Sequence, residues 1–153
     1  MLIESRTALD PELAALTAGE LQENGPDSAV FAPVEDAAYL VAVVDGRAVG
    51  CAAWRPGERG VAELLRMFVR PAFRGRGIAR QLIVAIEEEA LAAGRAVIRL
   101  VTGGHLPAAI ALFQSSGYHQ IPTCGEHAGT PHGLCFEKRL VALVPVRPPR
   151  HRP

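Results

Sequence analysis

The most constraining feature of the sequence is an apolar run that leads through a turn rich in glycine and arginine directly into an amphipathic helix. Residues 61–69 favour a strand, which Pro71 ends, and residues 77–93 favour a helix. Apolar residues recur at four-residue steps along one side of that helix, namely Ile78, Leu82, Ile86 and Ala90. The unpaired N–H groups of its first turn and its positive dipole end therefore converge beside the turn. This arrangement predicts an anion site that suits a pyrophosphate.

The turn itself consists of Arg74-Gly75-Arg76-Gly77. Its glycines let the backbone approach a ligand closely, and its arginines can add charge-assisted hydrogen bonds. The dinucleotide fingerprint does not fit, because Arg80 stands at its third glycine position, and no Gly-Lys-Ser/Thr follows as a Walker loop requires. An ordinary strand-to-helix turn with exposed arginines is the remaining alternative.

The rest of the chain favours the order β-α-β-β-β-α-β-α-β-β. We expect strands over 2–8, 39–44, 47–54, 61–69, 96–102, 118–121 and 133–140, and helices over 11–23, 77–93 and 107–116. Asp45-Gly46 between two apolar runs predicts a tight hairpin turn. Strand–helix–strand units make part of the sheet parallel and hairpins make the rest antiparallel, so the fold class is α/β (α+β). One domain over 1–140 and an extended Pro/Arg-rich tail over 141–153 are expected.

Two finer expectations concern which side chains share a face. Along residues 61–69, strand alternation places Glu63, Leu65, Met67 and Val69 on one face. In the helix over 77–93, the three glutamates at 87–89 are expected to lie mostly on the solvent side.

Composition excludes several classes of protein. The 153 residues are 49% apolar and 21% charged, which excludes a disordered chain. Sixteen basic residues balance sixteen acidic ones, so no global field favours nucleic acid or an anionic membrane. No apolar run approaches the roughly 18–20 residues that span a bilayer, and the first residues lack a secretory signal. Three cysteines form no framework, so we expect reduced thiols in the cytoplasm.

The glycine turn also carries a family resemblance. Arg74-x-x-Gly77-x-Ala79, after a Val-x-Pro strand end, resembles the Q/R-x-x-G-x-G/A signature of the GNAT acyltransferases. The similarity extends over the first strand and Asp10-Pro11, and over four later segments, namely Thr102-Gly103, the helix 107–113, Gly117-Tyr118 and the strand 135–140. It therefore covers nearly the whole chain up to residue 140.

This resemblance implies a fold and a cofactor. The fold would be a mixed, mostly antiparallel sheet flanked by helices and splayed between strands 4 and 5. Acetyl-CoA would lie in that splay, between residues 63–69 and 96–102. Its pyrophosphate would bind backbone N–H groups from Arg74 to Ala79, and its pantetheine arm would pair with residues 67–69. The implied cofactor-binding residues are Met67, Phe68, Val69, Arg74, Gly75, Arg76, Gly77, Ile78 and Ala79. A backbone N–H near Met67 would polarise the thioester carbonyl.

Acyl transfer to an amine requires a base, a means of holding the oxyanion and a way to protonate the leaving thiolate. Glu63 is the candidate base, since relatives with a similar Glu-x-x-Arg-x-x-Val strand use a carboxylate there to order a water molecule. A strand glutamate paired with an arginine is the equal alternative. Loop residues Glu126, His127 and His132 could substitute for it.

The general acid is where the sequence departs from the family. Phe113 stands where many relatives have the tyrosine that protonates the CoA sulfur, and phenylalanine has no proton to donate. Leu106 replaces a polar residue that contacts CoA in close relatives, and Tyr118 is expected to pack in the core. Water would then protonate the thiolate, or the protein would be a catalytically weak acyl-CoA sensor.

A late Cys/His cluster provides a third interpretation. Two thiols and two imidazoles, Cys124, His127, His132 and Cys135, could form a zinc shell in a metal-stabilised interaction domain. The spacing fits no standard zinc module, and Cys135 lies in an apolar strand, so we expect no metal. Among the aromatic residues, Tyr39 and Trp54 are expected in the core, and Phe31 lies in the segment that would wall the acceptor pocket.

The sequence therefore predicts a bacterial-type GNAT N-acetyltransferase. It would move an acetyl group from acetyl-CoA directly to a primary amine in a ternary complex. The acceptor would be a small molecule or a peptide amine, with no nucleic-acid or membrane partner. A homodimer formed through the last strands or the tail stays open.

Overall fold

The computed structural model describes residues 1–7, 9–24, 36–103, 106–122 and 133–140. Its strands are β1 (Leu2–Arg6), β2 (Ala38–Val44), β3 (Arg47–Pro56), β4 (Val61–Val69), β5 (Val97–Gly103), β6 (His119–Ile121) and β7 (Gly133–Arg139). Its helices are α1 (Pro11–Asn24), the 3-10 turn η2 (Pro71–Phe73), α2 (Ile78–Ala92) and α3 (Pro107–Ser115). The predicted order of elements is confirmed, and η2 is the one described element that the sequence analysis had taken as part of a turn. The predicted tail over 141–153 lies outside the described residues.

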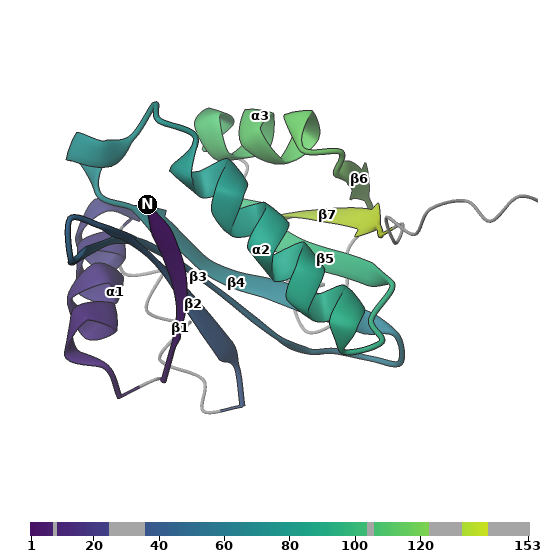
Figure 1. Cartoon of the computed structure of the whole chain (residues 1–153). Coiled ribbons are helices and arrows are strands. Elements are labelled where there is room, and N and C mark those ends of the chain that lie inside the picture. The colour runs from purple at the N-terminus through teal and green to yellow at the C-terminus, as the bar shows by residue number, and fades with distance from the viewer. Residues whose placement is uncertain (8, 25–35, 104–105, 123–132, 141–153) are drawn as a thin grey trace, which may run out of the picture.

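The seven strands form one sheet in the order β1-β2-β3-β4-β5-β7-β6 (Figure 1). The β4–β5 pair is parallel and every other pair is antiparallel. The prediction of a mixed, mostly antiparallel sheet is therefore confirmed.

Helices cover both faces of the sheet. In β2, Leu40 and Ala42 belong to the apolar cluster that contains the buried residues of α2, whereas Val41 and Val43 belong to the cluster under α1. Because successive strand residues point to opposite faces, α1 and α2 pack on opposite sides. Phe113 of α3 joins the α2 cluster. Figure 1 shows α2 lying across the sheet.

The predicted apolar side of α2 is confirmed, since Ile78, Leu82, Ile86 and Ala90 are all buried. The expectation for the three glutamates is wrong for two of them. Figure 1 shows that α2 lies close against the sheet, and Glu89 accepts a hydrogen bond from Trp54 Nε1 at 3.1 Å. Glu87 binds Tyr118 and Lys138, while Glu88 is exposed as expected. Among the described residues, no helix is both long and apolar enough to cross a bilayer.

The turn between β2 and β3 agrees with its prediction, whereas the end of β1 does not. Asp45 and Gly46 join β2 to β3 with φ values of 50° and 76°, as the predicted primed turn requires. In contrast, β1 ends at Arg6 rather than at residue 8. The chain turns there, because Asp10 N–H donates to Thr7 O and the Arg6 guanidinium binds Asp10.

Candidate active site

A fork between β4 and β5 opens toward the end of β4 that leads to the glycine turn. Their parallel pairing covers Val61–Glu63 of β4 and Val97–Arg99 of β5, after which the described strands separate. Among the described strands, none pairs with the last six residues of β4 on their β5 side. The splay predicted between strands 4 and 5 is confirmed.

A β-bulge lies in the part of β4 that pairs with β3 but not with β5. Cys51 faces Phe68 and Ala53 faces Leu65, so two residues of β4 oppose Ala52 of β3. A bulge shifts the alternation of side chains by one residue. Consistent with this, Leu65 and Phe68 both pack under α1.

The bulge corrects one prediction about β4. Val69 belongs to the α2 cluster and Met67 packs against that cluster, whereas Leu65 lies under α1. The expectation that Glu63, Leu65, Met67 and Val69 share one face is therefore wrong beyond Leu65. A bulged strand has no residue type that distinguishes it from a regular strand. The alternation of apolar and polar residues alone therefore did not reveal the bulge.

The glycine turn leads directly into the first turn of α2. Gly75 and Gly77 have φ values of 78° and 77°, in the left-handed region that favours glycine. A Cβ on either residue would meet nothing within 4 Å, so open space lies beside both. No described side chain caps α2 at Gly77, and the first N–H groups of a helix lack intrahelical partners. The first turn of α2 therefore begins beside open space with no side-chain cap at Gly77.

Two arginines of the turn lie over aromatic rings. The Arg74 guanidinium lies 5.5 Å from the Phe68 ring and its Nε donates to Val69 O at 2.9 Å. The Arg76 guanidinium lies 5.0 Å from the Phe73 ring, and both arginines are exposed. Arg74 thus stabilises the exit from β4 as well as placing positive charge beside the turn.

The candidate base Glu63 is the last residue of β4 that pairs with β5. Its carboxylate accepts a hydrogen bond from Arg55 Nε at 2.8 Å, and its side chain is 33% exposed. A Cβ on Gly57 would lie 3.1 Å from Glu63 Cγ, so glycine makes room for this side chain. The arginine pairing that was the alternative to a role as base is therefore present, and Glu63 lies at the closed end of the fork, where β4 and β5 begin to separate.

Glu63 belongs to a row of charges that crosses four strands. In register, Arg55 of β3 faces Glu63, Glu63 faces Arg99 of β5, and Arg99 faces Glu137 of β7. Residues in direct register project from the same face of a sheet. Arg99 Nε donates to Glu137 at 2.7 Å, and its Nη1 binds Glu58. We call Arg55, Glu63, Arg99 and Glu137 the charge row.

The charge row lies on the face that α1 covers, because Cys51 and Ala53 precede Arg55 on that side of β3. Sequence reasoning missed Arg55 and Arg99. Arg55 could have been found by pairing residues 47–56 with 61–69 across the Pro56–Gly60 turn. Arg99 required the parallel register, which no local signal reveals.

Phe113, which stands at the general-acid position of many relatives, and the nearby phenol Tyr118 are both buried. Phe113 and Tyr118 pack edge to face with ring centroids 5.7 Å apart. The Tyr118 hydroxyl donates to Glu87 at 2.9 Å. Burial, and then the negative charge of Glu87, raise the pKa of the Tyr118 phenol far above its ordinary range. The expectation that Tyr118 packs in the core is confirmed, and Leu106 precedes α3 as a half-buried residue.

Several predicted residues lie outside the described part of the chain, namely Phe31, Cys124, Glu126, His127 and His132.

The prediction of reduced thiols is wrong for Cys135, which is buried and disulfide-bonded. The odd number of cysteines gave no pairing signal. Within the described residues, no group of three or more His, Cys, Asp or Glu side chains could hold a metal. Tyr39 and Trp54 are buried, as expected.

Comparison with known proteins agrees with this geometry. The model of the acetyltransferase (GNAT) family matches residues 10–118. An IAA acetyltransferase of Azospirillum brasilense is 40% identical over 106 residues, which are 69% of this chain and 69% of that protein.

Two solved structures share the fold. One from Klebsiella pneumoniae, assigned as an acyl-CoA N-acyltransferase, has a TM-score of 0.79 and 31% identity, covering 92% of this chain and 97% of that one. A GNAT acetyltransferase of Elizabethkingia anophelis with acetyl-CoA bound has a TM-score of 0.73 and 16% identity, covering 91% and 97%. With a family match over most of the described residues and a fork of the expected kind, this chain belongs to the GNAT family of acetyltransferases.

Proposed function

We propose that this protein transfers an acetyl group from acetyl-CoA directly to a primary amine in a ternary complex. One observation carries the proposal. The β4 edge that lacks a described strand partner leads through η2 and the glycine turn to the N-terminus of α2, and open space lies beside Gly75 and Gly77. An extended ligand with an anionic group at one end fits such a path, because a strand edge offers hydrogen bonds and a helix N-terminus favours anions.

The residues of this path fit acetyl-CoA. Backbone N–H groups from Arg74 to Ala79 would hold the pyrophosphate, with the Arg76 guanidinium close by. The β4 edge at residues 67–69 would pair with the pantetheine arm. Acetyl-CoA supplies an activated thioester carbonyl when bound. The structure of similar fold from Elizabethkingia anophelis contains acetyl-CoA, which supports this choice of ligand.

For the chemistry, Glu63 would remove a proton from the amine through a water molecule. Arg55 Nε–H would keep one carboxylate oxygen of Glu63 in place, leaving the other available for that water. A backbone N–H at the β4 bulge near Met67 would donate to the thioester carbonyl, because a bulge redirects main-chain groups away from the ladder. Direct attack by the amine needs no covalent enzyme intermediate.

Water would protonate the departing thiolate. Phe113 has no proton to donate, and the Tyr118 hydroxyl is committed to Glu87. The same observation favours the second candidate function, a sensor that binds acyl-CoA and turns it over slowly. We propose a small-molecule or peptide amine as the acceptor.

Two assays test the proposal together. Calorimetric titration with acetyl-CoA, CoA and 3′-dephospho-CoA measures binding, and thiol release over a panel of amines measures turnover. We expect all three ligands to bind, since the proposed anchor is the pyrophosphate, and thiol release to depend on one class of amine. Binding without thiol release on any amine would support the sensor. Failure of all three ligands to bind would overturn both readings.

A further inference from the structure

Strand β3 extends beyond the end of its partner β4. Their ladder stops at the pair of Gly50 and Val69, and β4 then leaves the sheet at Pro71. Ala48 of β3 lies past this end and is 1% exposed. Buried backbone N–H and C=O groups that lose their ladder partners are costly unless other groups replace them.

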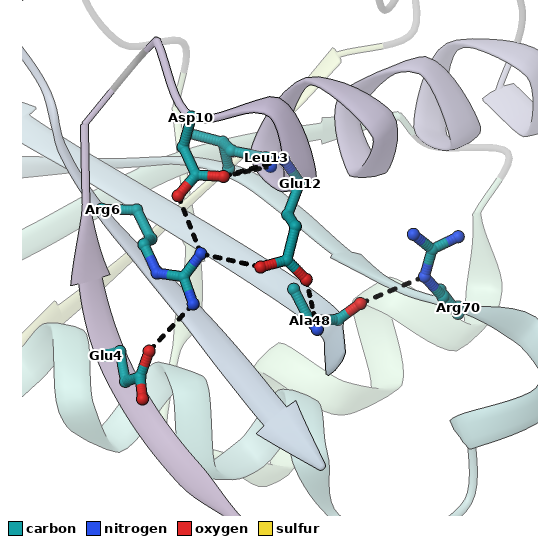
Figure 2. A network of polar contacts seen from close by, with 7 residues as sticks. All are labelled: Glu4, Arg6, Asp10, Glu12, Leu13, Ala48 and Arg70. Atoms are coloured by element: carbon teal, nitrogen blue, oxygen red, sulfur yellow. Dashed lines mark hydrogen bonds and ion pairs between the residues drawn. The ribbon is translucent and has the colours of Figure 1, made fainter. Parts of the chain in front are cut away.

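Side chains supply both replacements (Figure 2). The Glu12 carboxylate accepts the Ala48 N–H at 2.9 Å, and Arg70 Nε donates to Ala48 O at 3.2 Å. Glu12 comes from the first turn of α1, and Arg70 is the residue that follows β4. Two residues from distant parts of the chain therefore extend the ladder by one step where β4 has ended.

The Arg6 guanidinium holds this arrangement from the other side. Its Nη1 donates to Glu12 at 3.0 Å and to Asp10 at 2.7 Å, and Asp10 accepts the Glu12 N–H at 2.8 Å. The position of the Glu12 carboxylate is thus fixed by Arg6 and by the start of α1, as Figure 2 shows.

Arg70 is also the residue from which the glycine turn begins. Its N–H donates to Val49 O at 2.8 Å, and its carbonyl accepts the Phe73 N–H at 2.8 Å, which closes η2. With the side-chain bond to Ala48, three hydrogen bonds set where the chain leaves the sheet. Only a few residues separate this point from Gly75 and Gly77.

We infer that Arg70 and Glu12 are positioning residues for the turn that would bind acetyl-CoA, acting together through the backbone of Ala48. This inference rests on the proposed function. Hydrogen bonds to a pyrophosphate require donors placed to within a fraction of an ångström, and small displacements lower such affinities strongly. Glu12 acts through Ala48, so its substitution reports a positioning effect rather than a lost ligand contact.

The test measures the Kd for acetyl-CoA in the full chain carrying Arg70→Met or Glu12→Ala. We expect each substitution to raise Kd by about tenfold, as the loss of one positioning hydrogen bond would. The kcat at saturating acetyl-CoA and the KM for the amine should change less than about twofold, because the charge row is not involved. The double variant should be little worse than either single one, since both act on Ala48. Glu12→Gln, which keeps an acceptor for the Ala48 N–H, should recover part of the affinity.

Arg95→Met is the matched control. The Arg95 guanidinium also donates to strand and turn carbonyls, including Val61 O at 3.0 Å, but at the opposite end of β4. We expect it to lower stability without raising Kd. An unchanged Kd in folded Arg70→Met and Glu12→Ala variants, beside a wild type that binds acetyl-CoA, would overturn the positioning inference alone. A wild type that does not bind would instead overturn the proposed function.

Discussion

The two ends of β4 carry different parts of the candidate site, and the chain builds them in different ways. At the C-terminal end of β4, the glycine turn and the start of α2 come from one continuous stretch, residues 69–79. Near the N-terminal end of β4, the charge row takes one residue from each of four strands. Local backbone conformation therefore makes the first end, whereas strand register makes the second.

The two ends also differ in charge. The stretch from Val69 to Ala79 contains three arginines and no acidic residue, and its helix dipole adds positive potential. The charge row alternates two arginines with two glutamates, so its charges balance. An anion is favoured at the first end, while the second can hold a carboxylate in place without strongly attracting or repelling a neutral amine.

The largest expected effect is on acetyl-CoA binding at the glycine turn. Gly77→Asp places a carboxylate beside the proposed pyrophosphate site, where like charges about 4 Å apart repel by about 4 kcal/mol at an effective dielectric constant of 20. We therefore expect the Kd for acetyl-CoA, measured by calorimetry, to rise about 1,000-fold.

Gly46→Asp is the control for backbone strain. Gly46 has nearly the same φ, 76° against 77°, and a Cβ there also meets nothing within 4 Å. Both variants should lose similar stability, but only Gly77→Asp should lose affinity. Equal affinities in the two variants would remove the turn as the anion site.

The next largest expected effect is on kcat, through Glu63 of the charge row. Glu63→Gln keeps the shape of the side chain and removes the base, so we expect kcat to fall about 100-fold, within the usual range for general-base catalysis. The Kd for acetyl-CoA should stay within about twofold. The pH–rate curve should also change shape.

Glu4→Gln provides the comparison for this variant, because Glu4 is another strand glutamate paired with an arginine, at 2.9 Å from Arg6. It should leave kcat and the pH–rate curve unchanged. If Glu63→Gln behaves like Glu4→Gln, then Glu63 is only the partner of Arg55.

The same contrast explains what the sequence could predict. The turn at Asp45-Gly46, the strand over 61–69 and the start of α2 depend on local preferences, and the structure bears them out. The bulge near Met67 depends on how β4 packs against β3 and on which face each apolar residue can bury. Strict alternation therefore failed within a strand whose ends were predicted correctly.

For the candidate site, the motif from Arg74 to Ala79 was readable because its members are neighbours in the chain. Arg99 lies 36 residues after Glu63, and Ala48 lies 36 residues after Glu12. Such pairs are joined only by sheet register and helix docking, which a single sequence does not specify. Glu87 was likewise expected in solvent, because its partners Tyr118 and Lys138 come from distant segments.

A smaller effect sharpens the comparison within the charge row. Arg55→Met removes the donor that holds Glu63, and we expect kcat to fall about fivefold, the equivalent of one hydrogen bond of about 1 kcal/mol. If Arg55 acts through Glu63, the same substitution should change kcat less than about twofold in the Glu63→Gln background. Steady-state rates of the four proteins in this cycle give the coupling. Equal effects in both backgrounds would show that Arg55 acts independently of Glu63.

The smallest effect concerns the acidic groups that support the turn end. The Arg6 guanidinium lowers the pKa of Asp10, and the Ala48 N–H and then Arg6 lower the pKa of Glu12, below ordinary values of 3.8 and 4.5. The folded protein then binds fewer protons than the unfolded chain as these groups titrate, so its free energy of unfolding falls as the pH drops. This contribution should be complete above about pH 5 and be lost progressively below it. Urea unfolding between about pH 7 and pH 3 should show this decline, and Glu12→Gln should show a shallower one. Because this carboxylate also accepts the Ala48 N–H, parallel declines in the two proteins would mean that the ionised form of Glu12 adds nothing to the support of the turn.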